Sequence, residues 1–239
     1  MYRCLLIYDV VGHHVGSLPI LLYREFVLGF FLFTVFYQGV WGSGLPGTWI
    51  TFFTNWSFVA MALYSVIGIA VSAKGYYQKG APSPIWQALD KAFVIVYVTA
   101  ASNAIFLTAF YWVVIYEPEG TLHLDNVFRH GVNVVVMLGE LIISRLPIVS
   151  YHLQIPIAFT SVYAVFFWVY RGASGVWVYE ALNWSKTSSI LYYTVLPILI
   201  TLSFYLLYLV AHLRERFARK PFKGFQEAKI DDGIELAEV

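Results

Sequence analysis

The sequence has little charge and almost no cysteine. Charged residues make up 12% of the 239 positions, against roughly 25% in soluble domains. Cys4 is the single cysteine, so an intrachain disulfide is excluded and the redox compartment is left open. Cysteine, histidine and carboxylate residues never recur at the spacing of a zinc site. We therefore expect no metal and no other cofactor, and the lack of a basic patch argues against nucleic acid as a partner.

Targeting signals are also missing near the start. The first apolar run, 4–11, contains Asp9 and is followed by His13 and His14, with no small-residue cleavage pattern. We therefore expect no cleavable signal peptide. Palmitoylation of Cys4 is an alternative to a plain free thiol, and the free thiol is the favoured interpretation.

Apolar side chains, by contrast, are abundant. Hydrophobic residues make up 59% and aromatic residues 19% of the sequence, and the mean hydropathy is +0.68. A water-soluble fold would leave too much of this surface exposed, so the sequence predicts a protein dissolved in lipid. Many of the tyrosines and tryptophans are expected to anchor helices at the membrane interfaces.

Six apolar stretches reach or approach the ~20 residues that a helix needs to cross hydrocarbon. They are 25–41, 49–73, 88–116, 126–144, 150–170 and 188–213. The sequence thus predicts an all-α membrane protein, a bundle of six transmembrane helices, in the plasma membrane or an endomembrane such as the endoplasmic reticulum. Its parts would be an N-terminal segment 1–24, the transmembrane domain 25–213 and a polar tail 214–239.

The distribution of basic residues orients this bundle. Lys74, Lys79 and Arg145 lie in the loops after spans two and four, whereas the loop 117–125 holds three acids and no lysine or arginine. A basic run also follows span six, and it comprises Arg214, Arg216, Arg219, Lys220, Lys223 and Lys229. Basic residues concentrate on the cytosolic side, so both termini are expected in the cytosol.

Polar side chains inside spans are costly and normally face the bundle interior. The fourth stretch holds the densest set, with His130, Asn133, Glu140 and Ser144 on one helical stripe. The second holds Thr54 and Asn55 near its start.

Depth brings two of these groups to the same leaflet. Thr54 lies five residues, about 7.5 Å, beyond Trp49, and His130 lies four residues, about 6 Å, beyond Asn126. A hydroxyl becomes a nucleophile when an adjacent base takes its proton, so Thr54 with His130 is a candidate catalytic pair. Asn55 or Asn133 would supply an oxyanion donor. The alternative is that all of these groups only join neighbouring helices by hydrogen bonds.

Two other functions are less well supported by the pattern. Paired haem ligands should lie at one depth, but His130 and His152 are predicted on opposite sides of the membrane. Transport through Glu140 is the second, but the sequence shows no inverted repeat and no pair of broken helices, which are typical of transporters. A lone glutamate in a span is more often a hydrogen-bonded structural carboxyl.

Three separated segments carry a resemblance to a known family. The run from Trp49 to Ser57 resembles the second-span opening of rolling-stone-like proteins, and the run from His130 to Pro147 resembles their fourth span. The segment from Gly175 to Lys186 is similar to their last exoplasmic loop, which more usually reads Tyr-Pro and Asp-Trp-Ser-Lys-Pro. The resemblance covers about residues 18–215 and implies six spans.

That family is more distantly similar to the androgen-induced-gene and androgen-dependent TFPI-regulating membrane proteins, which are threonine hydrolases of fatty-acid esters of hydroxy fatty acids. The resemblance implies Thr54 as nucleophile and His130 as base, with Glu140 ten residues after the histidine as in those hydrolases. Thr54 lies one residue further from its tryptophan than their threonine does, so Thr51 is a second candidate for the hydroxyl.

The sequence thus predicts a membrane-embedded hydrolase of lipid ester bonds, with membrane lipids as its partners. Rolling-stone-like proteins themselves are linked to myoblast fusion and are not established enzymes. The alternative is therefore a non-catalytic multi-pass protein, acting in cell fusion or adhesion or as a subunit with membrane-protein partners.

Overall fold

A computed structural model describes residues 18–41, 48–77, 84–116, 124–144 and 146–217. The expectations for Cys4, for Arg145, for the rest of 1–17 and for the tail 218–239 lie outside these residues. The described part is mainly helical and holds no strand. Its elements are α1 (Leu18–Trp41), η2 (Trp49–Thr51), α2 (Phe53–Tyr77), α3 (Pro84–Phe110), η3 (Tyr111–Ile115), α4 (Leu124–Val127), η4 (Phe128–Val132), α5 (Asn133–Ser144), η5 (Ser150–Leu153), α6 (Gln154–Ser174), η6 (Glu180–Leu182) and α7 (Ser189–Phe217).

Five of the described helical stretches are long and apolar enough to cross a membrane. They are Leu18–Tyr37, Phe53–Ala73, Pro84–Val114, Ser150–Ser174 and Ser189–Phe217. The predicted all-α class and the presence of several membrane-spanning helices are confirmed at this level.

The predicted fourth span, 126–144, is the exception among the six. Its residues form three successive elements, α4, the π-helical turn η4 and α5. Helix α5 alone has 12 residues, about 18 Å of rise, which is shorter than the ~30 Å of hydrocarbon. A sixth crossing therefore needs all three elements together.

The first helix begins earlier than the sequence pattern indicated. Helix α1 starts at Leu18, seven residues before the predicted start of the span at 25. Pro19 fits the first turn of a helix, where its missing N–H group would have no partner in any case. Arg24 is consequently inside the helix and not in the segment 1–24 predicted to precede the span.

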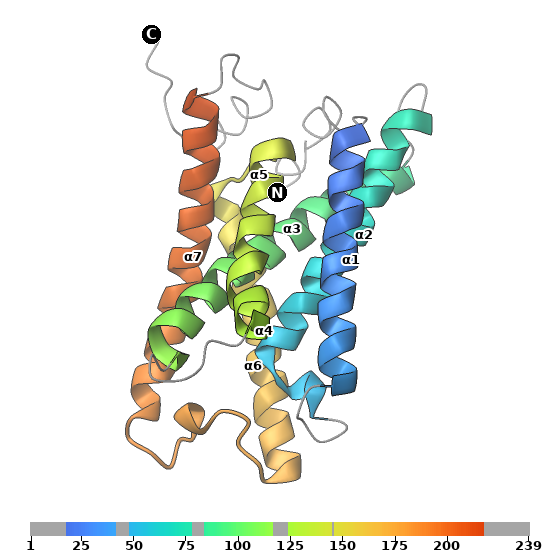
Figure 1. The fold of residues 1–239 in the computed structure, drawn as a ribbon. Helices are drawn as coiled ribbons and strands as arrows, with labels where there is room; N and C mark the ends of the chain where they lie inside the picture. The colour runs from blue at the N-terminus through green and yellow to red at the C-terminus, as the bar shows by residue number, and fades with distance from the viewer. Residues whose placement is uncertain (1–17, 42–47, 78–83, 117–123, 145, 218–239) are drawn as a thin grey trace.

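Helix α3 is the centre of the bundle. It crosses diagonally between α1 and α7, which lie on opposite sides (Figure 1). In the most apolar stretch of α3, 72% of the residues are buried, against 28% for α1 and 17% for the stretch that contains α6. The peripheral helices therefore pack on α3 and expose their other faces.

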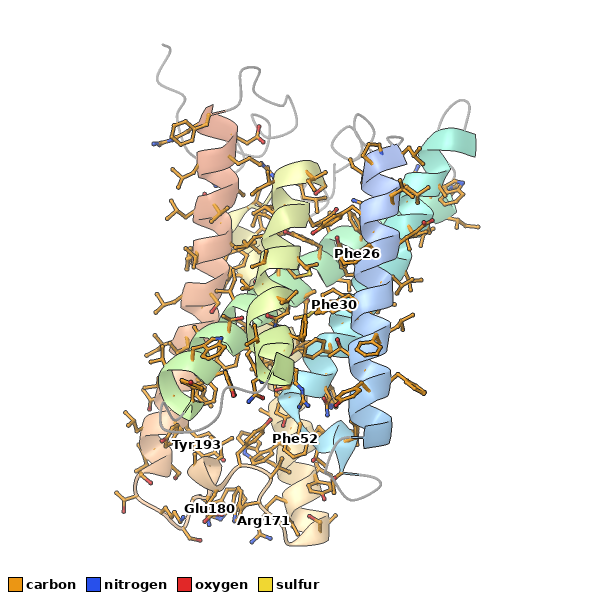
Figure 2. The ribbon with its side chains drawn as sticks, viewed as in Figure 1. Phe26, Phe30, Phe52, Arg171, Glu180 and Tyr193 are labelled. Carbon is orange, nitrogen blue, oxygen red and sulfur yellow. The ribbon has the colours of Figure 1, made fainter. Side chains whose placement is uncertain are left out.

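The exposed faces are apolar, as expected for a lipid-facing surface. Phe26, Val113 and Val169 are 71%, 83% and 66% exposed, and large apolar side chains point outward along the helices (Figure 2). An apolar surface of this extent is unfavourable in water and favourable in hydrocarbon.

Candidate functional site

The start of α2 is held by the loop between α6 and α7. The backbone N–H of Phe53 donates to the hydroxyl of Tyr179 at 2.9 Å. The hydroxyl of Tyr163, on α6, donates to the carbonyl of Thr51 at 2.6 Å. Burial raises the pKa of Tyr179 above its ordinary value of 10.0. The first turn of α2, which carries Thr54, is thus fixed from outside.

The same loop is ordered by its own polar contacts at one end of the molecule, where Arg171 and Glu180 are labelled (Figure 2). The Lys186 ammonium lies 2.7 Å from the Glu180 carboxylate. Hydrogen bonds from Lys186 and Asn183 hold the pKa of Glu180 below its ordinary value. The Arg171 guanidinium packs over the ring of Trp177, 4.9 Å from its centroid. This loop is one of the three segments that carry the family resemblance.

The hydroxyl of Thr54 differs from those of three other threonines in the described helices. Thr51 donates to the carbonyl of Thr48 at 2.6 Å and is 1% exposed. Thr34 and Thr99 likewise donate to the carbonyl one turn earlier. Thr54 is half-buried and makes no hydrogen bond with any part of the chain that the structure describes. Of the two candidate hydroxyls, Thr54 is therefore the one that is not already engaged.

Asn55, the neighbour of Thr54, has a local structural contact. Its side-chain amide donates to the carbonyl of Trp49 at 2.6 Å, and the residue is 6% exposed. This bond ties η2 to the first turn of α2. The amide predicted as an oxyanion donor thus already has an acceptor.

His130 lies in the π-helical turn η4 and is held from two directions. Its ring is stacked on Tyr111, with the centroids 3.9 Å apart and the planes 7° from parallel. Its backbone carbonyl accepts a hydrogen bond of 2.7 Å from the indole N–H of Trp112. Both aromatic residues belong to η3, a second π-helical turn. Isolated π-helical turns occur frequently at functional sites.

Asn133 joins two helices. Its side-chain oxygen accepts from the hydroxyl of Thr108, on α3, at 3.2 Å and from the N–H of Val134 at 2.8 Å. Asn133 is fully buried, as are Met137 and Glu140. The stripe predicted for the fourth apolar stretch thus faces the interior over α5.

Glu140 forms a buried ion pair with Arg24. The Nε and Nη2 atoms of Arg24 donate to Oε1 of Glu140 at 3.1 and 2.5 Å. The two side chains are 2% and 0% exposed. The Nη1 atom of Arg24 also donates to the carbonyl of Gly68 at 2.8 Å and to the hydroxyl of Ser72 at 2.6 Å. One guanidinium therefore joins α1, α2 and α5.

The ion pair was not anticipated from the sequence, because Arg24 was placed before the first span. The signal that would have found it is Pro19, which favours a helix start ahead of Arg24. A charge inside a span then requires a partner, and Glu140 is the carboxylate that lies furthest from the ends of a predicted span.

The structure brings some predicted residues together and places others apart. Thr54 shares one face of α2 with Ser72, eighteen residues or five helical turns later. Arg24 links Ser72 to Glu140, and so connects the interior stripes of α2 and α5 at one end. At the other end Thr54 and His130 have different neighbours, since the described contacts of the α2 start lead to η2, α6 and the α6–α7 loop, and those of His130 lead to η3.

Metal ligation has no support in the described residues, where no group of three or more histidine, cysteine or acidic side chains is placed to hold an ion. Comparisons with protein-family models, with curated proteins and with solved structures gave no match.

Proposed function

We propose that this multi-pass membrane protein hydrolyses a lipid ester, with Thr54 as nucleophile and His130 as base. The observation that carries the proposal is the contrast between these two side chains and their neighbours. The Thr54 hydroxyl has no described hydrogen bond on a turn that is otherwise fixed, and the His130 ring is positioned by stacking in a π-helical turn. A reactive hydroxyl and an oriented imidazole are the two groups that acyl transfer requires.

The reaction would proceed in two steps. The Thr54 oxygen attacks the ester carbonyl while His130 takes the hydroxyl proton, and the alcohol leaves with a proton returned by His130. Water then attacks the acyl-threonine, again with His130 as base, and releases the fatty acid. The pair must approach to about 3 Å in the reacting complex, which is closer than catalytic groups often lie without substrate.

The substrate class comes from the family resemblance. Fatty-acid esters of hydroxy fatty acids, or similar branched lipid esters, are the substrates that the resemblance implies. The loop that resembles the last exoplasmic loop of rolling-stone-like proteins holds the start of α2 through Tyr179. This contact supports a link between the loop and Thr54.

The orientation belongs to the same proposal. Six crossings, with α4, η4 and α5 together forming the fourth, and cytosolic termini would put the starts of α2 and α4 on the exoplasmic side. The membrane would be the plasma membrane or the endoplasmic reticulum.

A non-catalytic role is the second candidate, and the other predicted residues favour it. Asn55, Asn133 and Glu140 make hydrogen bonds or ion pairs that connect helices or close a local turn. A protein whose interior polar groups all serve packing would act in fusion or adhesion, or as a subunit beside membrane-protein partners.

Turnover of branched fatty-acid esters by purified protein separates the two functions. We expect Thr54→Ala and His130→Ala each to lower the rate by roughly 10²–10⁴-fold, with helical content and thermal unfolding unchanged. Thr201→Ala is the matched control, because its hydroxyl only bonds the carbonyl of Pro197 on α7. Equal turnover by wild type and both alanine variants would contradict the catalytic assignment.

A further inference from the structure

A groove lies between α2, α3 and α6, and neither Thr54 nor His130 lines it. Its volume is about 800 Å³, inside the range of roughly 300–1,000 Å³ that is typical of ligand pockets. It runs from Trp49 of η2 along α2 to Leu63. It is bordered by Ile95 and Thr99 of α3 and by Gln154, Ile155, Ala158 and Phe159 of α6. Thr54 precedes Trp56 by two residues, about 200° around the helix, so it lies on the opposite face of α2.

Small side chains leave this space open. Ala60 of α2 and Ala158 of α6 border the groove from its two sides. Trp56 and Phe159 meet edge to face with centroids 6.3 Å apart. The helices are thus held apart by aromatic rings while two methyl groups face the space between them.

The dimensions suit one extended hydrocarbon chain. The part of α2 from its first residue, Phe53, to Leu63 covers eleven residues, about 15 Å of helix from first to last. One leaflet contributes roughly 15 Å of hydrocarbon, half of the ~30 Å of a bilayer. A single acyl chain therefore fits along the groove, and a headgroup would remain outside it.

The uncharged lining favours an esterified acyl chain over a free fatty acid. No described lining residue is charged, and the Thr99 hydroxyl already donates to the carbonyl of Ile95 at 3.0 Å. Apolar cavities stay dry, so water is a poor occupant. A free fatty acid would find no cation for its carboxylate, whereas an esterified chain needs none. The indole of Trp49 marks an interfacial end beside which an ester group can lie.

We infer that the groove holds one acyl chain of a membrane phospholipid, with its ester end beside Trp49. This goes beyond the proposed hydrolysis and does not depend on it.

The test uses full-length protein in nanodiscs of phosphatidylcholine that carries a diazirine on one acyl chain. After illumination, mass spectrometry maps the adducts. We expect enrichment at Leu63 and Ile155 over the lipid-facing Phe26 and Phe33 of α1. Ala158→Phe fills the groove from an exposed position and should lower groove adducts several-fold, with Ala158→Leu intermediate. Val169→Phe, also on the exposed face of α6 but outside the groove, is the matched control and should match wild type.

Three results would overturn the inference. Adducts spread evenly over α1 and the groove would mean ordinary contact with bulk lipid. Equal labelling of the Ala158→Phe and Val169→Phe variants would mean that the groove is not occupied by a chain. Loss of groove adducts on adding free palmitate, but not on adding unlabelled phosphatidylcholine, would identify a free fatty acid as the occupant. Each result is independent of ester turnover, so it leaves the catalytic proposal to its own test.

Discussion

At the scale of single residues, Arg24 and Glu140 depend on each other. Both are removed from solvent within the helix bundle, and each provides the opposite charge that the other lacks. Removing one partner of a buried ion pair leaves an uncompensated charge, which costs about 3–5 kcal/mol, whereas replacing both with apolar residues of similar volume is often neutral. The pair is therefore expected to behave as a unit under mutation.

We predict that Arg24→Met and Glu140→Met each lower the free energy of unfolding by about 3–5 kcal/mol, and that the double variant recovers most of the loss. Unfolding in mild detergent, followed by circular dichroism, measures all three. Glu25→Met, at the neighbouring position on α1, is the control for a change in charge alone. A double variant that is as unstable as the sum of the single variants would show that the two side chains do not act as a pair.

At the scale of elements, α7 supports the end of α5. The last carbonyl groups of a helix have no partner within it. The Arg214 guanidinium, in the last turn of α7, donates to the carbonyl of Leu141 and, at 3.0 Å, to that of Leu146. Arg214 is the first residue of the predicted polar tail 214–239, and its position on α7 gives it a capping role in addition.

We predict that Arg214→Ala destabilises the protein by about 1.5–3 kcal/mol, the usual contribution of hydrogen bonds to a charged group. Hydrogen exchange should increase at the end of α5 and in η5 before it does elsewhere. Arg216→Ala is the matched control, because Arg216 is exposed in the same turn and should change stability by less than about 0.5 kcal/mol. Identical exchange in the two variants would contradict the cap.

Helix type and approximate length were predictable, because they depend on apolar composition along the chain. The early start of α1 was indicated by Pro19 but was not predicted. The two π-helical turns were not predictable, since they depend on local backbone geometry around Tyr111 and His130. The contact between Arg24 and Glu140 joins residues 116 positions apart, and the sequence pattern carries no information on which interior faces meet. Thr54 and His130 were chosen as candidates from residue type and depth in the membrane. That the two act together in a reaction stays a prediction.

At the scale of the whole molecule, the helix bundle contains two distinct regions. On one side, α1, α2 and α5 meet at Arg24 and Glu140. On another, α2, α3 and α6 leave the apolar groove open. Arg24 bonds Gly68 and Ser72 of α2, and Thr54 shares a face of that helix with Ser72. Trp56 and Ala60, on the other side of α2, line the groove.

The basic tail predicts the direction in which this bundle crosses the membrane. Helix α7 has 29 residues, about 43 Å of rise, which exceeds the ~30 Å hydrocarbon core. Ser185, before α7, and Phe217, at its end, should therefore lie on opposite sides. The six basic residues beginning at Arg214 favour the cytosolic side for the end of α7.

In a Cys4→Ala background, we predict that a membrane-impermeant maleimide labels Ser185→Cys from the exoplasmic side of sealed vesicles. Phe217→Cys should react only after permeabilisation, because its side chain, 85% exposed, would lie on the cytosolic side. Leu202→Cys, on the lipid-facing surface of α7, is the control that should stay unlabelled in both conditions, since thiolate does not form in hydrocarbon. The reversed pattern would place the end of α7 outside the cytosol. Labelling of Ser185→Cys and Phe217→Cys from one side would show that α7 does not cross.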